Sequence, residues 1–281
     1  MKHIPVLLGA VLEALGDVKG RTVVDCTFGA GGYTRTFLER GANVIAFDRD
    51  PNVADDANAI AKEYGARFRF IPLPFSNLGQ LEEPVDAIVF DLGISSMQID
   101  IAERGFSFRA DAALDMRMSG VGETAAQLIN RLSVAALADV LRNYGDVKKA
   151  AILARVIKDA NPQTTFELRD LIHNPKDVAP VFQALRIAVN DEMGEVERAL
   201  AVVPELLKVS GKCVCVTFHS LEDRIVKNTF KQWTTAPGDP RMPVVADAPF
   251  VSIKPQVPTD TELENNPRAR SAHMRGVIKS Y

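Results

Sequence analysis

Short apolar runs alternate with amphipathic segments over the first third of the chain. Four runs are rich in β-branched or aromatic residues and predict buried strands: Thr22–Cys26, Asn43–Phe47, Phe68–Ile71 and Val85–Phe90. Between the first three runs, apolar positions recur at helical spacing over Tyr33–Arg40 and Pro51–Tyr64. Strands that alternate with helices predict an α/β fold, in which helices cover both faces of a parallel sheet.

The alternation stops after Ser96 and gives way to helical patterning. Ser133 and Thr165 are candidate N-caps of two helices, and a further helix is predicted from about Asp146 to Asp159. We therefore predict one domain in two pieces with an inserted helical subdomain between them. The two pieces are residues 1–103 and 181–281, and the insert is residues 104–180.

Strand patterning returns at Lys212–Phe218, which we expect to join the same sheet. Before that strand, apolar residues keep three-and-four spacing from Phe182 to Leu207, a seam typical of core-facing helices. Gly194 and Pro204 favour two helices over one in this seam. The segment Thr235–Pro258 is rich in Pro and Asp, and we predict that it is irregular.

A glycine-rich turn, Thr27–Gly32, follows the first predicted strand. Its glycines permit positive φ and a close approach of the backbone to a ligand. Adjacent Gly31 and Gly32 depart from the G-x-G-x-x-G spacing of dinucleotide loops, which argues against a nicotinamide-dependent dehydrogenase. The turn is more similar to the loop that holds S-adenosylmethionine (SAM), although a glycine-rich turn alone is as often structural.

Polar residues stand where the predicted strands end, and ligands of open α/β sheets bind outside the carboxyl ends of the strands. Asp48 ends the second strand segment and is placed to accept hydrogen bonds from a ribose. Asp91 follows the fourth strand, and His219 follows Lys212–Phe218. Phe75, after the third strand, is either a ring that packs on adenine or a plug of the domain. Asp48 and His219 also have structural alternatives, as a surface acid at a strand end and as a structural histidine.

Composition narrows the class of protein. The 281 residues are 47% hydrophobic and carry a net charge of −3, so overall charge does not draw this globular chain to nucleic acid. No apolar run approaches the ~20 residues of a membrane span, and no signal-peptide pattern opens the chain. We therefore expect a cytoplasmic protein without a membrane partner. Three cysteines in or beside predicted strands favour buried thiols over a metal site.

Nine sequence blocks occur in an order that is more specific than any one block. They are His3–Leu8, Thr27–Gly32, Asp48–Pro51, Asp91–Ser96, Glu103–Phe108, Leu114–Met118, Phe182–Asn190, Phe218–Lys227 and Asn266–Ser271. Together they resemble the ribosomal RNA small subunit methyltransferase H family (RsmH, or MraW). The resemblance implies a class I, Rossmann-like methyltransferase that uses SAM to methylate N4 of a cytidine in the decoding region of bacterial 16S rRNA.

By position, the resemblance also implies the contacts with SAM. They fall on Gly31, Gly32, Tyr33, Asp48, Phe75, Asp91 and Gln98. The family usually has His where this chain has Tyr33. Within the predicted insert, Gly145–Lys148 replaces the family's Gly-Glu-Glu-Arg and Val178–Pro180 replaces its Ala-Thr-Arg, so RNA contacts there transfer least well.

The lone pair of cytosine N4 is delocalised into the ring, so an enzyme must orient the amine and stabilise positive charge on the nitrogen. Asp91 is the first candidate for charge stabilisation, with His219 or Asp223 as the proton acceptor. A non-catalytic small-subunit assembly factor with the same fold is the alternative, which the intact glycine turn, Asp48 and Asp91 disfavour.

Two groups of residues are candidates for contact with 16S rRNA in the small ribosomal subunit. Arg104, Phe106, Phe108 and Arg109 offer planes for stacking on bases, or they pin their loop to the core. Arg268, Arg270 and Arg275 concentrate positive charge on an acidic chain, either for phosphates or as a solvated or bracing edge.

Overall fold

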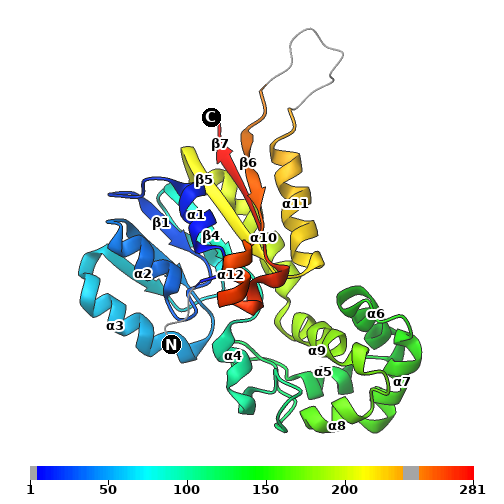
Figure 1. The fold of residues 1–281 in the computed structure, drawn as a ribbon. Helices are drawn as coiled ribbons and strands as arrows, with labels where there is room; N and C mark the ends of the chain where they lie inside the picture. The colour runs from blue at the N-terminus through cyan, green and yellow to red at the C-terminus, as the bar shows by residue number, and fades with distance from the viewer. Residues whose placement is uncertain (1–4, 237–246) are drawn as a thin grey trace, which may run out of the picture. The chain divides into compact units, whose positions relative to one another are not determined.

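The computed structural model describes residues 5–236 and 247–281. Seven strands form one sheet in the order β3-β2-β1-β4-β5-β7-β6 (Figure 1). The strands are β1 (Thr22–Asp25), β2 (Asn43–Phe47), β3 (Phe68–Ile71), β4 (Val85–Asp91), β5 (Leu207–Thr217), β6 (Phe250–Gln256) and β7 (His273–Lys279). The α/β class predicted from the alternation of strands and helices is confirmed.

The helices divide by their place in the chain. Those interleaved with strands are α1 (Leu8–Leu15), α2 (Gly32–Glu39), α3 (Ala54–Tyr64), α10 (Glu192–Leu206), α11 (Ser220–Trp233) and α12 (Asp260–Asn265). Those that lie between β4 and α10 are α4 (Ser96–Asp100), α5 (Ala125–Arg131), α6 (Val134–Gly145), α7 (Ala150–Ala160), α8 (Thr165–Asp170) and α9 (Pro175–Asn190). Among the described residues, no helix has both the length and the hydropathy that a membrane crossing needs.

The strand pairing places the carboxyl ends of the five parallel strands, β1 to β5, at one edge of the sheet. β1 pairs in parallel with β2 and β4, and β4 pairs in parallel with β5. The expectation that Lys212–Phe218 joins the sheet is therefore confirmed. β7 runs antiparallel between β5 and β6. Parallel strands bring their carboxyl ends to the same edge, so residues that follow β1, β2, β4 and β5 lie near one another.

Residues alternate along the strands between two hydrophobic layers, as the pleat requires. Val23, Val89 and Val214 face one layer, which includes side chains of α1, α2 and α3. Val24, Ile88 and Cys213 face the other, which includes side chains of α10 and α11. Cys26, Cys213 and Cys215 are buried free thiols in this second layer.

The chain divides into two compact units. Unit 1 comprises residues 1–93 and 193–281 and contains the sheet, and unit 2 comprises residues 94–192. The sequence-based bounds of the insert, residues 104 and 180, lie inside unit 2. Unit 2 has its own core, with Leu137, Leu141, Ala154, Ile157 and Leu185 fully buried.

Some local predictions differ from the structure. The apolar seam does form two helices, α9 and α10, but they meet at Asp191 in the left-handed region (φ 48°) rather than at Gly194. Pro204 lies inside α10. The N-cap of α8 is Thr164 and not Thr165.

The segment Thr235–Pro258 is not wholly irregular, because residues 250–256 form β6. Pairing of β6 with β7 supplies the backbone partners that its composition does not suggest. Residues 237–246 of the segment lie outside the described residues.

Candidate functional site

The glycine turn after β1 ends in a residue for which glycine is favoured. Gly31 is the N-cap of α2 in the left-handed conformation (φ 74°). A Cβ atom at Gly31 would lie 2.7 Å from Cδ1 of Ile60, so any other residue would be strained there and would displace the Ile60 side chain. The turn delivers the N-terminal N–H groups of α2 to the sheet edge, where they can meet a ligand.

Asp25, the last residue of β1, stabilises this turn through its side chain. Its carboxylate accepts hydrogen bonds from the backbone N–H of Thr27 at 3.1 Å and from Oγ1 of Thr34 at 2.7 Å. The side chain is fully buried, and burial raises its pKa to about 6 against the effect of these hydrogen bonds. Asp25 therefore ties the end of β1 to the first turn of α2. No functional role was predicted for it from the sequence.

Asp48, which follows β2, also stabilises this turn through its side chain. Its Oδ2 accepts a hydrogen bond from the N–H of Gly29 at 2.8 Å, and its Oδ1 accepts one from the N–H of Asp50 at 2.9 Å. Burial raises the pKa of Asp48 in spite of these hydrogen bonds. Since each carboxylate oxygen has a second lone pair, Asp48 can still accept a hydrogen bond from a ribose.

Asp91 is the acid with an unused oxygen. Its backbone N–H donates to Oγ1 of Thr27 at 2.8 Å, which connects the end of β4 to the glycine turn. Its Oδ1 atom is buried and has no hydrogen-bond partner among the described residues. Burial, followed by the negative charges of Asp25 and Glu222, raises the pKa of Asp91 well above its ordinary value. A buried carboxylate oxygen without a partner at a strand end indicates a place for a ligand.

His219 and Glu222 form the end of the site after β5. His219 is the N-cap of α11, where Nδ1 weakly accepts the N–H of Glu222 at 3.4 Å. Oε2 of Glu222 accepts the N–H of Phe218 at 2.9 Å, and its Oε1 lies 3.0 Å from Nε2 of His219. Nε2 of His219 and Oε1 of Glu222 are close enough for an ion pair, but they are not aligned for a hydrogen bond. Glu222 was not predicted as a site residue, although its spacing from His219 matches a capping box.

Asp223 has a structural partner. Arg275 of β7 donates two hydrogen bonds to its carboxylate, at 2.7 and 2.9 Å. Burial alone would raise the pKa of Asp223, but the hydrogen bonds and charge of Arg275 outweigh it and lower the pKa. The pair joins α11 to β7, so Arg275 braces the fold.

Three other predicted contacts are less direct. The Tyr33 side chain is buried and its hydroxyl donates to the carbonyl of Val6, so only its backbone faces the turn. Phe75 packs edge-on against Phe90 of β4, with ring centroids 5.6 Å apart. Gln98 belongs to unit 2, and its side chain completes a capping box with Ser95 at the start of α4.

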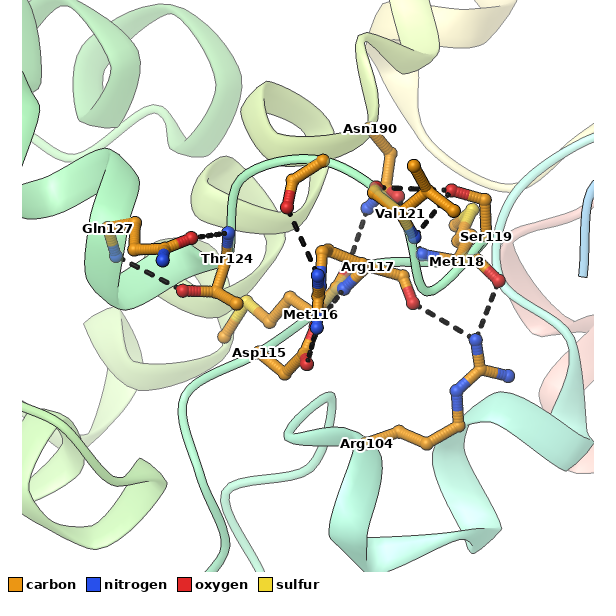
Figure 2. A network of polar contacts seen from close by, with 11 residues as sticks. Arg104, Asp115, Met116, Arg117, Met118, Ser119, Val121, Thr124, Gln127 and Asn190 are labelled. Carbon is orange, nitrogen blue, oxygen red and sulfur yellow. Dashed lines mark hydrogen bonds and ion pairs between the residues drawn. The ribbon is translucent and has the colours of Figure 1, made fainter.

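In unit 2, contacts within the local structure engage candidate stacking residues, and Figure 2 shows those of Arg104. The Arg104 guanidinium donates to the carbonyls of Arg117 at 3.0 Å and of Met118 at 2.7 Å. Asn190 accepts the N–H of Met118 at 2.8 Å, which fixes the same loop from α9. Phe108 packs on Phe182 with centroids 5.5 Å apart. These contacts favour the alternative in which the loop is pinned to the core.

The chain was compared with known proteins. The MraW methylase family matches residues 1–280. Relatives from Brucella ovis and Brucella canis, both named ribosomal RNA small subunit methyltransferase H, are 44% identical over 100% of this chain and 88% of their own lengths. A solved rRNA methylase from Streptococcus thermophilus aligns with 100% of this chain and 99% of its own, at 14% identity and a TM-score of 0.46. With a full-length family match and 44% identity to these relatives, the chain belongs to the MraW methylase family of SAM-dependent methyltransferases.

Proposed function

We propose that this protein methylates N4 of a cytidine in the decoding region of 16S rRNA, in the cytoplasm and with SAM as the methyl donor. The full-length identity of 44% to relatives named ribosomal RNA small subunit methyltransferase H carries the proposal. The choice of N4 and of the decoding region rests on the nine sequence blocks.

The residues at the sheet edge fit SAM. Gly31 begins α2 at the end of β1, so the unpaired N–H groups of the first turn of α2 are available to a ligand, and Asp48 retains lone pairs for a ribose. Asp25, Asp48 and Asp91 all have raised pKa values. The negative charge of Asp25 contributes to the raised pKa of Asp91. A cluster of carboxyls with restricted access to water favours a cationic ligand such as a sulfonium and disfavours the pyrophosphate of a nicotinamide cofactor.

Bound SAM supplies an electrophilic methyl group. We assign to Asp91 the stabilisation of positive charge on N4 and the acceptance of its proton, because Oδ1 of Asp91 is unpartnered and its pKa is raised. Nδ1 of His219 is engaged as the N-cap of α11, and Asp223 is held by Arg275. His219 and Asp223 therefore position α11 in this proposal. The main contribution of the chain is orientation of the two reactants.

The experiment is methyl transfer from labelled SAM to 30S subunits that lack the modification, followed by mass analysis of the nucleosides. We expect N4-methylated cytidine with the wild type and a kcat lower by ~10²–10⁴-fold with Asp91→Asn. Methyl transfer to a different nucleoside, or none with a SAM-binding wild type, would refute the proposal. Stabilisation by SAM and S-adenosylhomocysteine but not by NAD, in a thermal-shift panel, would separate it from a dehydrogenase.

A further inference from the structure

Helix α7 of unit 2 carries apolar residues on two faces. Ala150, Ala154 and Ile157 are buried in the core of unit 2. Ile152 is 67% exposed and Val156 is 37% exposed. These two residues are four positions apart, so they are neighbours on the outer surface of the helix. An exposed apolar pair at this spacing makes no contribution to the core and is available to a partner.

Three cations accompany this apolar pair. Lys148 and Lys149 immediately precede α7, and Arg155 lies within it. All three are exposed, and within residues 5–236 and 247–281 none has a carboxylate or other polar side-chain partner. The contrast is Lys158 on the same helix, whose Nζ donates to the carbonyl of Ile129 at 3.0 Å. The cations of the outer surface are therefore not used by the fold.

Two exposed acids lie near these cations in the sequence, and the first, Asp146, precedes Lys148 by two residues. Asp159 lies one turn beyond Arg155, at the end of α7 away from the two lysines. The N-terminal end of the helix, where the lysines stand, also carries the positive end of the helix dipole. A concentration of unpaired positive charge on a chain with a net charge of −3 is complementary to a polyanion.

We propose that Lys148, Lys149, Ile152, Arg155 and Val156, the α7 face, dock on the ribosomal RNA substrate. The inference rests on the proposed function. The lysines and the arginine contact phosphates, which supply affinity and orientation without reading sequence. Ile152 and Val156 cover ribose and base edges in the wide, shallow minor groove of an RNA helix. RNA is favoured over a protein partner because three exposed cations have no carboxylate of their own chain to satisfy them.

The test compares two charge variants of the full-length protein. Lys148→Ala/Lys149→Ala/Arg155→Ala removes the cations of the α7 face. Lys19→Ala/Lys62→Ala/Arg69→Ala removes three exposed cations of unit 1 as the matched control. The measurement is the affinity for a naked 16S decoding-region RNA and for 30S subunits, as log affinity against log salt.

We expect the α7 variant to lower the salt slope by about 2.7, at roughly 0.9 per lost phosphate contact on a duplex, and to weaken binding about tenfold at low salt. The control should give a line parallel to the wild type. Ile152→Ser/Val156→Ser should weaken binding several-fold with an unchanged slope, and Asp159→Asn should tighten it. All variants should keep the melting temperature, the SAM affinity and the kcat at saturating RNA.

Parallel lines for the α7 variant and the wild type would overturn the inference. A loss seen with 30S subunits but not with naked RNA would also overturn it, because it would identify a ribosomal protein as the partner. A wild type that binds RNA with the expected slopes but transfers no methyl group would refute the proposed function and leave the α7 face supported.

Discussion

At the scale of single residues, the Asp48 carboxylate has a structural role and a proposed role in binding. It holds the glycine turn through the N–H of Gly29, and it is the candidate acceptor for a ribose. We expect Asp48→Ala to weaken SAM binding by ~1–3 kcal/mol, because hydrogen bonds to a charged acceptor are lost. RNA affinity should barely change. Titration calorimetry with SAM provides the measurement, and an unchanged affinity would remove Asp48 from the cofactor site.

Asp25 makes the folded protein sensitive to pH. Burial raises its pKa from an ordinary 3.8 to about 6. An acid whose pKa is raised on folding binds its proton more tightly in the folded state. The free energy of unfolding therefore falls as the pH rises from about 4 to about 6, by about 3 kcal/mol for this group alone, and stays lower above that range.

We expect Asp25→Asn to abolish this contribution. The stability of the variant relative to the wild type should increase by up to about 3 kcal/mol between pH 4 and pH 7.5. Urea denaturation at a series of pH values gives the two profiles. The comparison cancels the contributions of Asp48 and Asp91, except where they couple to Asp25. Profiles that run parallel over the whole range would contradict a raised pKa at Asp25.

The sequence indicated the acids at the strand ends but not how their neighbours use them. The positions of Asp48 and Asp91 at the ends of strands could be predicted, because the pattern of apolar residues alone identifies where a parallel strand ends. The burial of the Tyr33 side chain could not be predicted, because its hydroxyl donates to the carbonyl of Val6, a residue 27 positions away. Glu222 was missed because its position three residues after His219 is that of a helix-capping residue, and the sequence does not show that the same residue also borders the site.

At the scale of elements, Gly31 connects β1 to α2 in a conformation that excludes side chains. We expect Gly31→Ala to lower the free energy of unfolding by ~1–2 kcal/mol, because alanine is strained at φ 74° and its Cβ would clash with Ile60. SAM affinity should fall as well. Gly9→Ala is the matched control, since it lies in α1 with no atom within 4 Å of its Cβ and should stabilise by ~1 kcal/mol. Equal thermal shifts in both variants would contradict this account.

Arg275 and Asp223 connect two elements that are adjacent in unit 1, α11 and β7. Their side chains are 22% and 23% exposed, so water screens the pair only in part. We expect Arg275→Ala to lower the free energy of unfolding by about 1–3 kcal/mol, because two charge-assisted hydrogen bonds are lost. Chemical denaturation measures it, and Asp223→Asn should produce a similar loss. A fully stable Arg275→Ala protein would show that the pair does not brace the sheet.

Regular elements were predictable to the extent that their own residues determine them. β2 and β3 have the bounds that the apolar runs predict, residues 43–47 and 68–71. The break between α9 and α10 at Asp191 was not predictable, because an aspartate in the left-handed region is a weaker signal than Gly194. β6 was missed because its hydrogen bonds come from β7, which follows it in sequence.

At the scale of the whole molecule, the distribution of charge matters more than its sum. Arg268 and Arg270 are exposed, next to the start of β7, and Arg275 is occupied by Asp223. We expect Arg268→Ala/Arg270→Ala to lower the salt slope of 30S binding by somewhat less than one unit per lost contact and to leave SAM affinity unchanged. Early melting or a loss of SAM affinity in the double variant would instead assign these arginines to the fold.

The position of β7 between β5 and the edge strand β6 has a consequence for how the protein is made. Unit 2 emerges from a ribosome as one uninterrupted stretch, residues 94–192, and can collapse around its own core. The sheet must wait for residues 273–279, which are inserted between β5 and β6. At a synthesis rate of roughly 5–20 residues per second, β4 waits on the order of 10–35 s for β7. A chain whose translation stops early therefore lacks the strand that joins β6 to β5, and we expect the cell to degrade it before it can act.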